Sequence, residues 1–193
     1  MTDVEARRFD LVAVGASAGG VDALMSILQQ LPADFAPAVL VVLHVSAERP
    51  CQVAALLGER CRLPVAEALD KQPIVPGTVT VAPPDYHMLV EPDRRISLSL
   101  DDPVMFSRPA IDPTFESAAI VYRERLLAVL LTGASRDGSS GAVAVRSHGG
   151  VLWVEDPATA HAATMPGSAL QTAGADEILP LPRIGSMLAG LGR

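Results

Sequence analysis

The sequence predicts an α/β fold: a doubly wound, mainly parallel sheet with helices on both faces and an antiparallel β-hairpin insert. Almost uniformly apolar runs recur at 11–15, 38–45 and 126–131, as is typical of parallel strands buried on both faces. Turns and apolar residues at helical spacing follow these runs, and one central stretch alternates between apolar and polar residues. Repeated strand-then-helix units indicate a parallel sheet with right-handed crossovers.

The first unit combines a strand at 11–15, a turn of small residues and a helix with apolar residues at helical spacing. Its turn, Gly15-Ala16-Ser17-Ala18-Gly19, fits G-x-S-x-G, a sharp turn that exposes a serine hydroxyl. The helix start supplies free N–H groups and positive potential for a developing oxyanion. Two other interpretations stay open: the serine caps the helix, or the glycines bind a phosphate. The fingerprint G-x-G-x-x-G is absent, because residue 17 is serine.

The remaining elements are predicted in chain order. Between the second and third buried strands we expect a turn at 46–50, a short helix at 52–57, a short strand at 63–69, an alternating strand at 78–82, a hairpin of 87–90 with 96–100, and a helix at 113–123. After the third strand we expect a helix ending near 147, a strand at 151–154, a loop at 156–166, and helices at 167–172 and 184–191 around a short strand near Ile178. No long linker divides the chain, so we expect one domain over 1–193 with its core at about 10–180.

Composition narrows the class of protein. The net charge of −7 gives no reason to expect nucleic acid as a partner. The N-terminus has no signal-peptide pattern, and no apolar run approaches a membrane span, so we expect a cytoplasmic protein without membrane insertion. Cys51 and Cys61 match neither a zinc pair nor a C-x-x-C redox motif. We therefore expect no metal and no cofactor.

Three polar residues lie at or just past the carboxyl ends of predicted strands, where ligands bind in open α/β sheets. Ser17 follows the first strand, His44 lies near the end of the second, and Asp137 follows the third. A nucleophile, a base and a carboxylate that orients the base are the parts of a serine hydrolase. Singly, His44 is also explained as a structural residue, and Asp137 as the cap of the next helix. Their common sheet edge favours catalysis.

Further polar residues are secondary candidates. His87 begins the hairpin and either lines the cleft or lies on the surface, and His161, on a loop past a strand end, is the substitute base. Arg108 and Arg136 are candidates for a cleft rim. An ordinary α/β-hydrolase is rejected, because the serine follows the first strand and the order Ser, His, Asp differs from that fold.

Six stretches carry a family resemblance: VGASAGGVDAL, VVLHV, VAPPDYHML, RPAIDPTFESAA, LLTGASRDGSSG and GGVLWVEDPATAHAATMPGSAL. With them the chain resembles the catalytic domain of the chemotaxis protein-glutamate methylesterases, the CheB family. The stretches follow the family's order and cover about residues 10–180. The family fold is a parallel α/β sheet with an antiparallel hairpin, in agreement with the prediction above.

The resemblance implies hydrolysis of methyl esters on glutamate side chains of methyl-accepting chemoreceptor-type proteins, release of methanol, and deamidation of particular glutamines. By position, it implies Ser17 as nucleophile, His44 as base and Asp137 as the orienting carboxylate. Backbone N–H donors for the oxyanion would map to about Ala134, with Ala18 beside the serine.

The chain departs from the family pattern beside the site, where Ala18, Leu43 and Ala134-Ser135 replace the usual Thr, Gln and Met-Gly. The family's best-known members also carry an N-terminal receiver domain, whereas about nine residues precede the first strand here. We therefore expect a stand-alone catalytic domain that is constitutively active or controlled by a separate response-regulator protein, or an excised fragment. The alternative functions are a catalytically weak binding or regulatory module of a chemosensory pathway, and a deamidase with little esterase activity.

Overall fold

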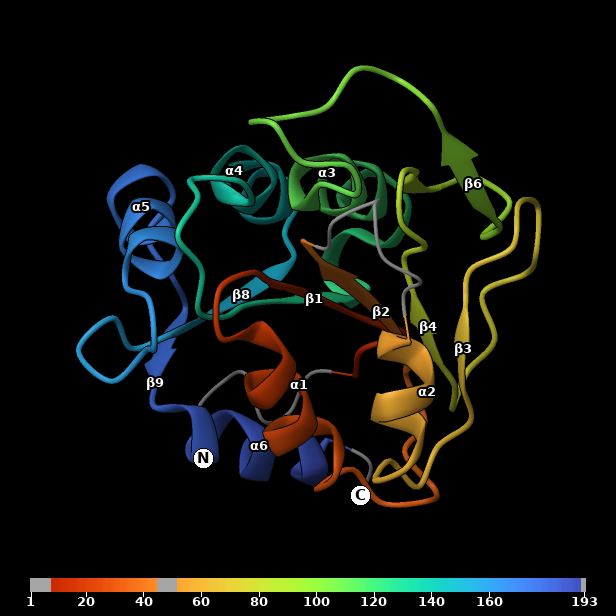
Figure 1. The fold of residues 1–193 in the computed structure, drawn as a ribbon, viewed down its shortest axis with the longest axis horizontal. Helices are drawn as coiled ribbons and strands as arrows, with labels where there is room; N and C mark the ends of the chain where they lie inside the picture. The colour runs from red at the N-terminus through yellow and green to blue at the C-terminus, as the bar shows by residue number, and fades with distance from the viewer. Residues whose placement is uncertain (1–7, 45–51, 192–193) are drawn as a thin grey trace.

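The computed structural model describes residues 8–44 and 52–191. A seven-stranded sheet lies between two layers of helices, and a two-stranded hairpin lies beside it (Figure 1). This arrangement confirms the predicted fold class. The turn predicted at 46–50 and Cys51 lie outside the described residues.

The seven strands of the main sheet are parallel and run in the order β3-β4-β2-β1-β7-β8-β9. Their bounds are β1 Leu11–Ala16, β2 Ala38–Leu43, β3 Val65–Glu67, β4 Val79–Val81, β7 Leu126–Leu130, β8 Val151–Glu155 and β9 Glu177–Leu179. From β1 the chain builds one side of the sheet, then returns to β7 beside β1 and builds the other side. The strand order therefore reverses between β1 and β7, and ligands bind at the carboxyl ends of strands at such a point.

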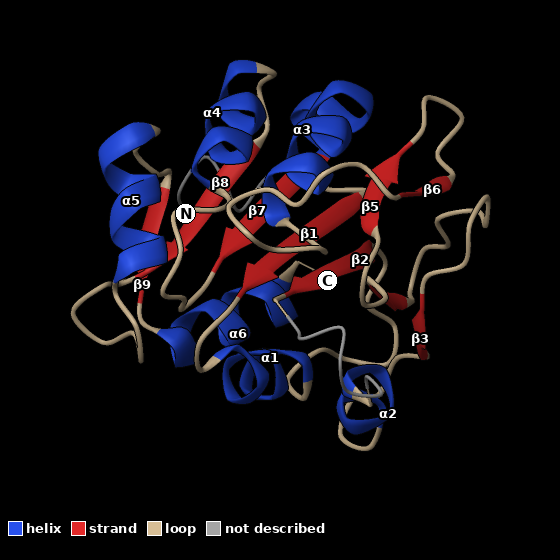
Figure 2. Cartoon of the chain, turned by 45° about the horizontal axis from the view of Figure 1, so that its top comes forward, coloured by secondary structure: helices blue, strands red, loops and turns tan. Residues whose placement is uncertain are grey.

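Helices cover both faces of the sheet (Figure 2). One layer consists of α1 Gly20–Leu28, α2 Val53–Gly58 and α6 Leu181–Gly190; the other consists of α3 Ile111–Tyr122, α4 Ser139–Ser147 and α5 Thr164–Thr172. A 3₁₀ turn at Arg123–Arg125 links α3 to β7, and the antiparallel hairpin of β5 His87–Val90 and β6 Ile96–Ser99 packs on the α3 side. No helix in the described ranges is long and apolar enough to cross a membrane.

The core divides into two clusters because successive side chains of a strand point to opposite faces. In β1, Val12 and Val14 pack toward α1, whereas Leu11 and Ala13 pack toward α3. All six residues of β1 and all six of β2 are buried, which explains why these strands carry no charged residue. The same alternation bears on the side of the sheet to which a residue directly after a strand points.

Three helices begin two or three residues before their predicted starts. The first residues of α3, α5 and α6 are 111, 164 and 181 rather than 113, 167 and 184. Each has a proline within its first turn: Pro113, Pro166 and Pro182. Proline is tolerated there because the first-turn N–H groups have no partner within the helix. The prolines thus lie inside the helices and do not mark their boundaries.

Candidate active site

Ser17 directly follows β1, in a turn that the neighbouring strand holds in place. Its N–H donates to the Thr132 carbonyl at 2.9 Å, and its own carbonyl accepts the Gly20 N–H at 2.7 Å. The N-cap residue of α1 is Gly19, whose φ of 76° lies in the left-handed region, and no side chain of the described residues caps this helix. The Ser17 hydroxyl is therefore not a helix cap, which removes one rival interpretation.

His44 lies level with Ser17 on the adjacent strand. The last pair of the β1–β2 ladder is Ala16 with Leu43, and the His44 N–H continues the ladder by donating to the Ala16 carbonyl at 3.2 Å. Adjacent strands lie about 4.8 Å apart across a sheet. The His44 ring faces Asp137 and Ser107 on the α3 side. The strand register thus brings the backbones of Ser17 and His44 to one point of the sheet edge.

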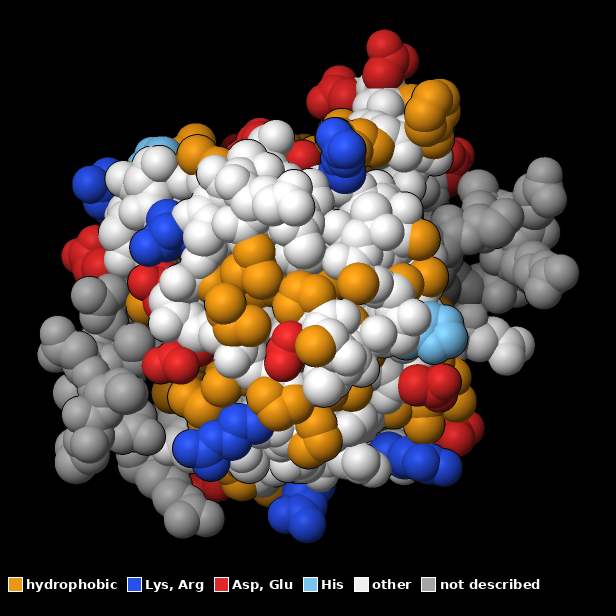
Figure 3. Space-filling view, turned by 90° about the vertical axis from the view of Figure 1, so that its left-hand side faces the viewer, with side chains coloured by type: hydrophobic (Ala, Val, Ile, Leu, Met, Phe, Trp, Pro, Cys, Tyr) orange, Lys and Arg blue, Asp and Glu red, His pale blue; other side chains and the backbone are white. Residues whose placement is uncertain are grey.

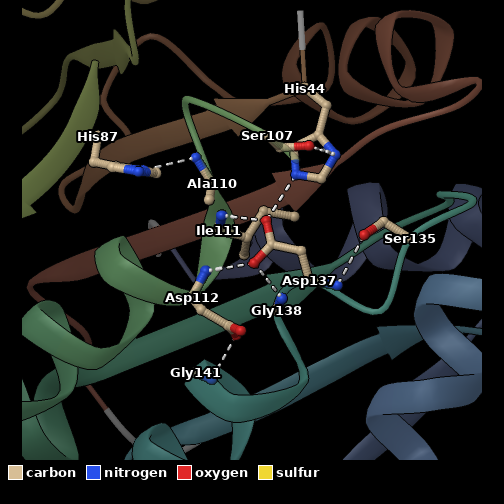
Figure 4. Close-up of polar contacts among 10 residues, drawn as sticks. All are labelled: His44, His87, Ser107, Ala110, Ile111, Asp112, Ser135, Asp137, Gly138 and Gly141. Carbon is tan, nitrogen blue, oxygen red and sulfur yellow. Dashed lines mark hydrogen bonds and ion pairs between the residues drawn. The ribbon is translucent and has the colours of Figure 1, made fainter. Parts of the chain in front are cut away.

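Asp137 is buried and holds the His44 ring (Figure 4). Its Oδ2 lies 2.7 Å from His44 Nε2 and accepts the Ile111 N–H at 2.5 Å. Its Oδ1 accepts the N–H groups of Asp112 at 3.0 Å and Gly138 at 2.9 Å. Three backbone donors and one ring therefore satisfy the carboxylate and fix the orientation of the imidazole.

Two of these backbone donors belong to the first turn of α3. The N-cap residue of α3 is Ala110, which has no side-chain acceptor, and Asp137 supplies that acceptor from after β7. The positive end of the helix favours a negative charge at this position. The sequence instead suggested a cap for the following helix, α4, whose N-cap residue is Gly138. Asp137 thus connects the start of α3 to His44.

His44 Nδ1 is the ring nitrogen left for a hydroxyl, because Nε2 faces Asp137. The Oγ of Ser107 lies 3.3 Å from Nδ1. In the described part of the chain, the Ser17 hydroxyl makes no hydrogen bond to the ring. Sequence analysis did not find Ser107, because it lies in an irregular loop between the hairpin and α3 and no strand end marks it.

The backbone beside Ser17 is rigid and has free donors. The Thr132 hydroxyl donates to the Ala18 carbonyl at 2.9 Å and accepts the Ala162 N–H at 2.8 Å. Within residues 8–44 and 52–191, neither the Ala18 N–H nor the Ala134 N–H donates to a protein acceptor. Within the described residues, both groups are therefore free to donate to a bound ligand.

His87 and Arg108 lie near the site but are bonded to the protein itself. His87 is 2% exposed; its Nδ1 accepts the Ala110 N–H at 3.2 Å, and its Nε2 lies 3.1 Å from the Asp102 carbonyl. The Arg108 guanidinium donates to the Asp85 carboxylate at 2.7 Å. These bonds fix the loop before α3, which contains Ser107 and lies next to His44.

A cleft of about 780 Å³ adjoins the serine turn on the α1 and α6 side, between Gly19, Thr132 and the start of α6. Its lining includes Glu155. Burial raises the pKa of the Glu155 carboxyl, and the hydrogen bond from the Thr132 N–H lowers it. His161 lines the cleft and packs its ring on Gly19. Neither Ser17 nor His44 is among the described residues that line this cleft.

Comparison with known proteins identifies the family. A model of the CheB methylesterase family matches residues 12–188. The chain belongs to the CheB methylesterase family. The crystal structure of the Thermotoga maritima CheB methylesterase catalytic domain is 33% identical to it, with a TM-score of 0.90, and the match covers 96% of this chain and 100% of that chain.

Curated CheB relatives differ in length. A protein of Leptospira interrogans, provisionally named protein-glutamate methylesterase/protein-glutamine glutaminase, is 39% identical over 183 residues, which are 95% of each chain. The protein of that name from Symbiobacterium thermophilum is 41% identical over 174 residues, which cover 90% of this chain and 48% of that relative. The chain therefore spans nearly all of one relative and about half of the other.

No group of three or more His, Cys, Asp or Glu side chains among the described residues could hold a metal ion. Cys61 is a free cysteine, and burial raises the pKa of its thiol. A raised pKa leaves less of the reactive thiolate.

Proposed function

We propose that this chain is a protein-glutamate methylesterase, a serine hydrolase that removes methyl esters from glutamate side chains of chemoreceptor-type signalling proteins and releases methanol. The observation that carries the proposal is the register of β1 against β2, which brings Ser17 level with His44 while Asp137 orients the ring. Family membership supports the same activity. We also propose that the protein acts in the cytoplasm and that a separate response-regulator protein controls its activity.

In the first half of the reaction, Ser17 Oγ attacks the ester carbonyl carbon while His44 Nδ1 accepts the hydroxyl proton. Asp137 holds the proton on Nε2, so that the lone pair lies on Nδ1, and it stabilises the imidazolium that forms. The N–H groups of Ala18 and Ala134 bind the oxyanion. The intermediate expels methoxide, which takes the proton from His44 and leaves as methanol.

In the second half, water attacks the acyl-enzyme while His44 accepts its proton. The intermediate collapses to the glutamate carboxylate, and Ser17 recovers its proton. A glutamine forms the same acyl-enzyme, with ammonia as the leaving group in place of methanol, so deamidation needs no additional residue. Ester and amide differ only in the group that His44 protonates.

Two serines lie near one base, and we assign the nucleophile to Ser17. It lies at a helix N-terminus beside the free N–H groups of Ala18 and Ala134, whereas Ser107 lies in the loop before α3. Catalytic hydrogen bonds are often long before substrate binds and tighten with it. The absence of a direct Ser17–His44 bond in the described structure therefore does not oppose the assignment.

The test measures methanol release from a methylated receptor signalling fragment by the wild type, Ser17→Ala and Ser107→Ala. The two variants are matched, because each removes one hydroxyl near the same base. We expect Ser17→Ala to lower kcat by at least about a thousandfold and Ser107→Ala by less than about tenfold. Asp137→Asn is expected to lower kcat by about a thousandfold or more, because the ring loses its correct tautomer.

Equal release by the wild type and Ser17→Ala would contradict the assignment. A large loss in Ser107→Ala alone would move the nucleophile to Ser107. If the wild type releases no methanol and a serine-directed phosphonate labels no residue, the chain is the catalytically weak binding or regulatory module instead.

A further inference from the structure

The loop between β6 and α3 contains a tight turn with an exposed apolar tip. Val104 and Ser107 exchange two backbone hydrogen bonds, at 3.1 and 2.9 Å, around Met105 and Phe106. Both central residues have positive φ, 47° and 66°, in a two-residue turn where glycine and asparagine are usual. Phe106 is 102% exposed and Met105 is 47% exposed. Closing the turn does not require two large apolar side chains, so their presence needs another reason.

The base of this loop is fixed to the body of the protein. The Arg108 guanidinium donates twice to the Asp85 carboxylate, at 3.0 and 2.7 Å. It also donates to the backbone carbonyls of Leu100 at 3.0 Å and Asp101 at 3.1 Å. The apolar tip is therefore presented to solvent by an anchored loop.

The tip adjoins the proposed catalytic base. Ser107, the residue after Phe106, places its Oγ 3.3 Å from His44 Nδ1 (Figure 4), and consecutive Cα atoms are about 3.8 Å apart. The loop stands away from the body at the top of Figure 1, and hydrophobic side chains lie beside acidic ones at the top of Figure 3. The tip therefore directly precedes the loop residue that contacts His44.

We propose that Met105 and Phe106 form a docking tip that binds the substrate itself, a receptor-type helix, through apolar side chains next to the esterified glutamate. The inference rests on the proposed function. The net charge of −7 and the exposed Asp101 and Asp102 give no attraction for a segment that carries glutamates. Apolar contact then has to supply the affinity. A methyl ester is neutral and each hydrolysis leaves a carboxylate, so these surroundings bind the substrate better than the product.

Docking of this kind requires a particular spacing in the substrate between an apolar residue and the esterified glutamate. Residues three and four apart in a helix lie on one face, with Cβ atoms about 5–6 Å apart. Because the tip is one and two residues from Ser107, it reaches an apolar side chain about one helical turn from the esterified glutamate. A segment with an apolar residue three or four positions from that glutamate is the better substrate.

The experiment compares Phe106→Ala with Ile120→Ala in the full chain. Ile120 is a matched control, because it is also exposed (60%) and lies on α3, about 13 Å along the helix from its start at the site. Binding of a methylated helical receptor fragment is measured by fluorescence anisotropy with Ser17→Ala added to each variant. Methanol release from the fragment and hydrolysis of p-nitrophenyl acetate are measured with Ser17 intact.

We expect Phe106→Ala to weaken fragment binding at least about tenfold, as for a central apolar anchor. It should raise KM for the fragment at least about ten times more than it raises KM for the small ester. Ile120→Ala should change the binding of the fragment and the KM for the fragment by less than about twofold each.

Unchanged binding and KM in Phe106→Ala overturn the docking tip while leaving the esterase intact. A matching loss with the small ester also overturns it, because the tip would then act through His44. If the fragment binds through Phe106 but no methanol is released, docking stands and the esterase assignment fails. If the wild type neither binds nor hydrolyses the fragment, both fail.

Discussion

Two carboxyl groups share the start of α3 and meet different surroundings. Asp137 accepts three backbone N–H groups and faces the His44 ring, whereas Asp112 Oδ1 accepts the Gly141 N–H at 2.7 Å. Burial raises the pKa of Asp112 to about 6, the hydrogen bond from Gly141 opposes this rise, and the charge of Asp137 adds to it. Asp112 therefore loses its proton at about pH 6, directly beside the Asp137 carboxylate.

The first prediction concerns Asp112→Asn. Asparagine keeps an oxygen for the Gly141 N–H but does not ionise. The folded wild type holds the Asp112 proton more tightly than the unfolded chain, so its stability falls as pH rises from about 4 through about 6. A pKa raised from 3.8 to about 6 corresponds to a loss of up to about 3 kcal/mol. We expect the variant to gain stability relative to the wild type between pH 4 and pH 8, measured by urea unfolding.

Glu116→Gln is the control for that measurement. Burial also raises the pKa of Glu116, but the residue is exposed on the same helix, so its change should depend less on pH. A stability difference between Asp112→Asn and the wild type that stays constant from pH 4 to pH 8 would contradict the prediction.

The residues of the proposed site differ in whether their place in it could be predicted from the sequence. Ser17, His44 and Asp137 follow apolar strands, and the parallel sheet brings strand ends together, so their proximity could be predicted. Ser107 and Asp112 lie in a loop and at a helix start, and they reach the site only through tertiary packing. No local pattern marks such residues.

At the scale of elements, the site depends on how closely α3 approaches α4. A Cβ atom at Gly141 would lie 2.5 Å from Phe115 Cβ and 3.3 Å from the Asp112 backbone. Only a glycine permits this contact without displacement of α3. Because the first N–H groups of α3 hold Asp137, the helix contact also fixes the proposed catalytic carboxylate.

The second prediction compares Gly141→Ala with Gly167→Ala, two substitutions within helices. We expect Gly141→Ala to cost about 1–3 kcal/mol by overpacking and to lower kcat for a small ester, because the start of α3 shifts beneath Asp137. Apart from its chain neighbours and its own helix backbone, no described atom lies within 4 Å of a Cβ at Gly167, so that variant should gain about 0.5–1 kcal/mol from helix propensity. Urea unfolding and ester hydrolysis measure both effects; equal changes in the two variants would contradict the account.

Strands were easier to predict than helix starts. A parallel strand buried on both faces must be apolar along its whole length, and β1, β2 and β7 satisfy this condition. Helix starts depend on which N–H groups are satisfied by distant residues. The start of α3 is set by Asp137, which is 26 residues away from Ile111 in the chain, and therefore it could not be read from the residues around Pro113.

At the scale of the whole molecule, the topology brings the residues of the proposed site together at one edge of the sheet of an acidic protein. The strand order reverses between β1 and β7, and the residues after both strands, together with the residue after β2, form the proposed site. The net charge of −7 surrounds this edge with a field that opposes anionic partners. Arg108 and Arg136 are the two cations that the sequence proposed for the rim; Arg108 pairs with Asp85, and Arg136 is exposed.

The last prediction follows from this charge. Like charges repel less when salt screens them, and the Debye length falls from about 30 Å at 0.01 M to about 10 Å at 0.1 M. We therefore expect kcat/KM for an acidic methylated receptor fragment to rise severalfold as ionic strength increases from about 0.01 to 0.1 M, mainly through KM. Hydrolysis of a neutral small ester, measured in the same buffers, should change little. A fall in kcat/KM for the fragment would contradict this view, since it would mean that local cations such as Arg136 attract the substrate more strongly than the net charge repels it.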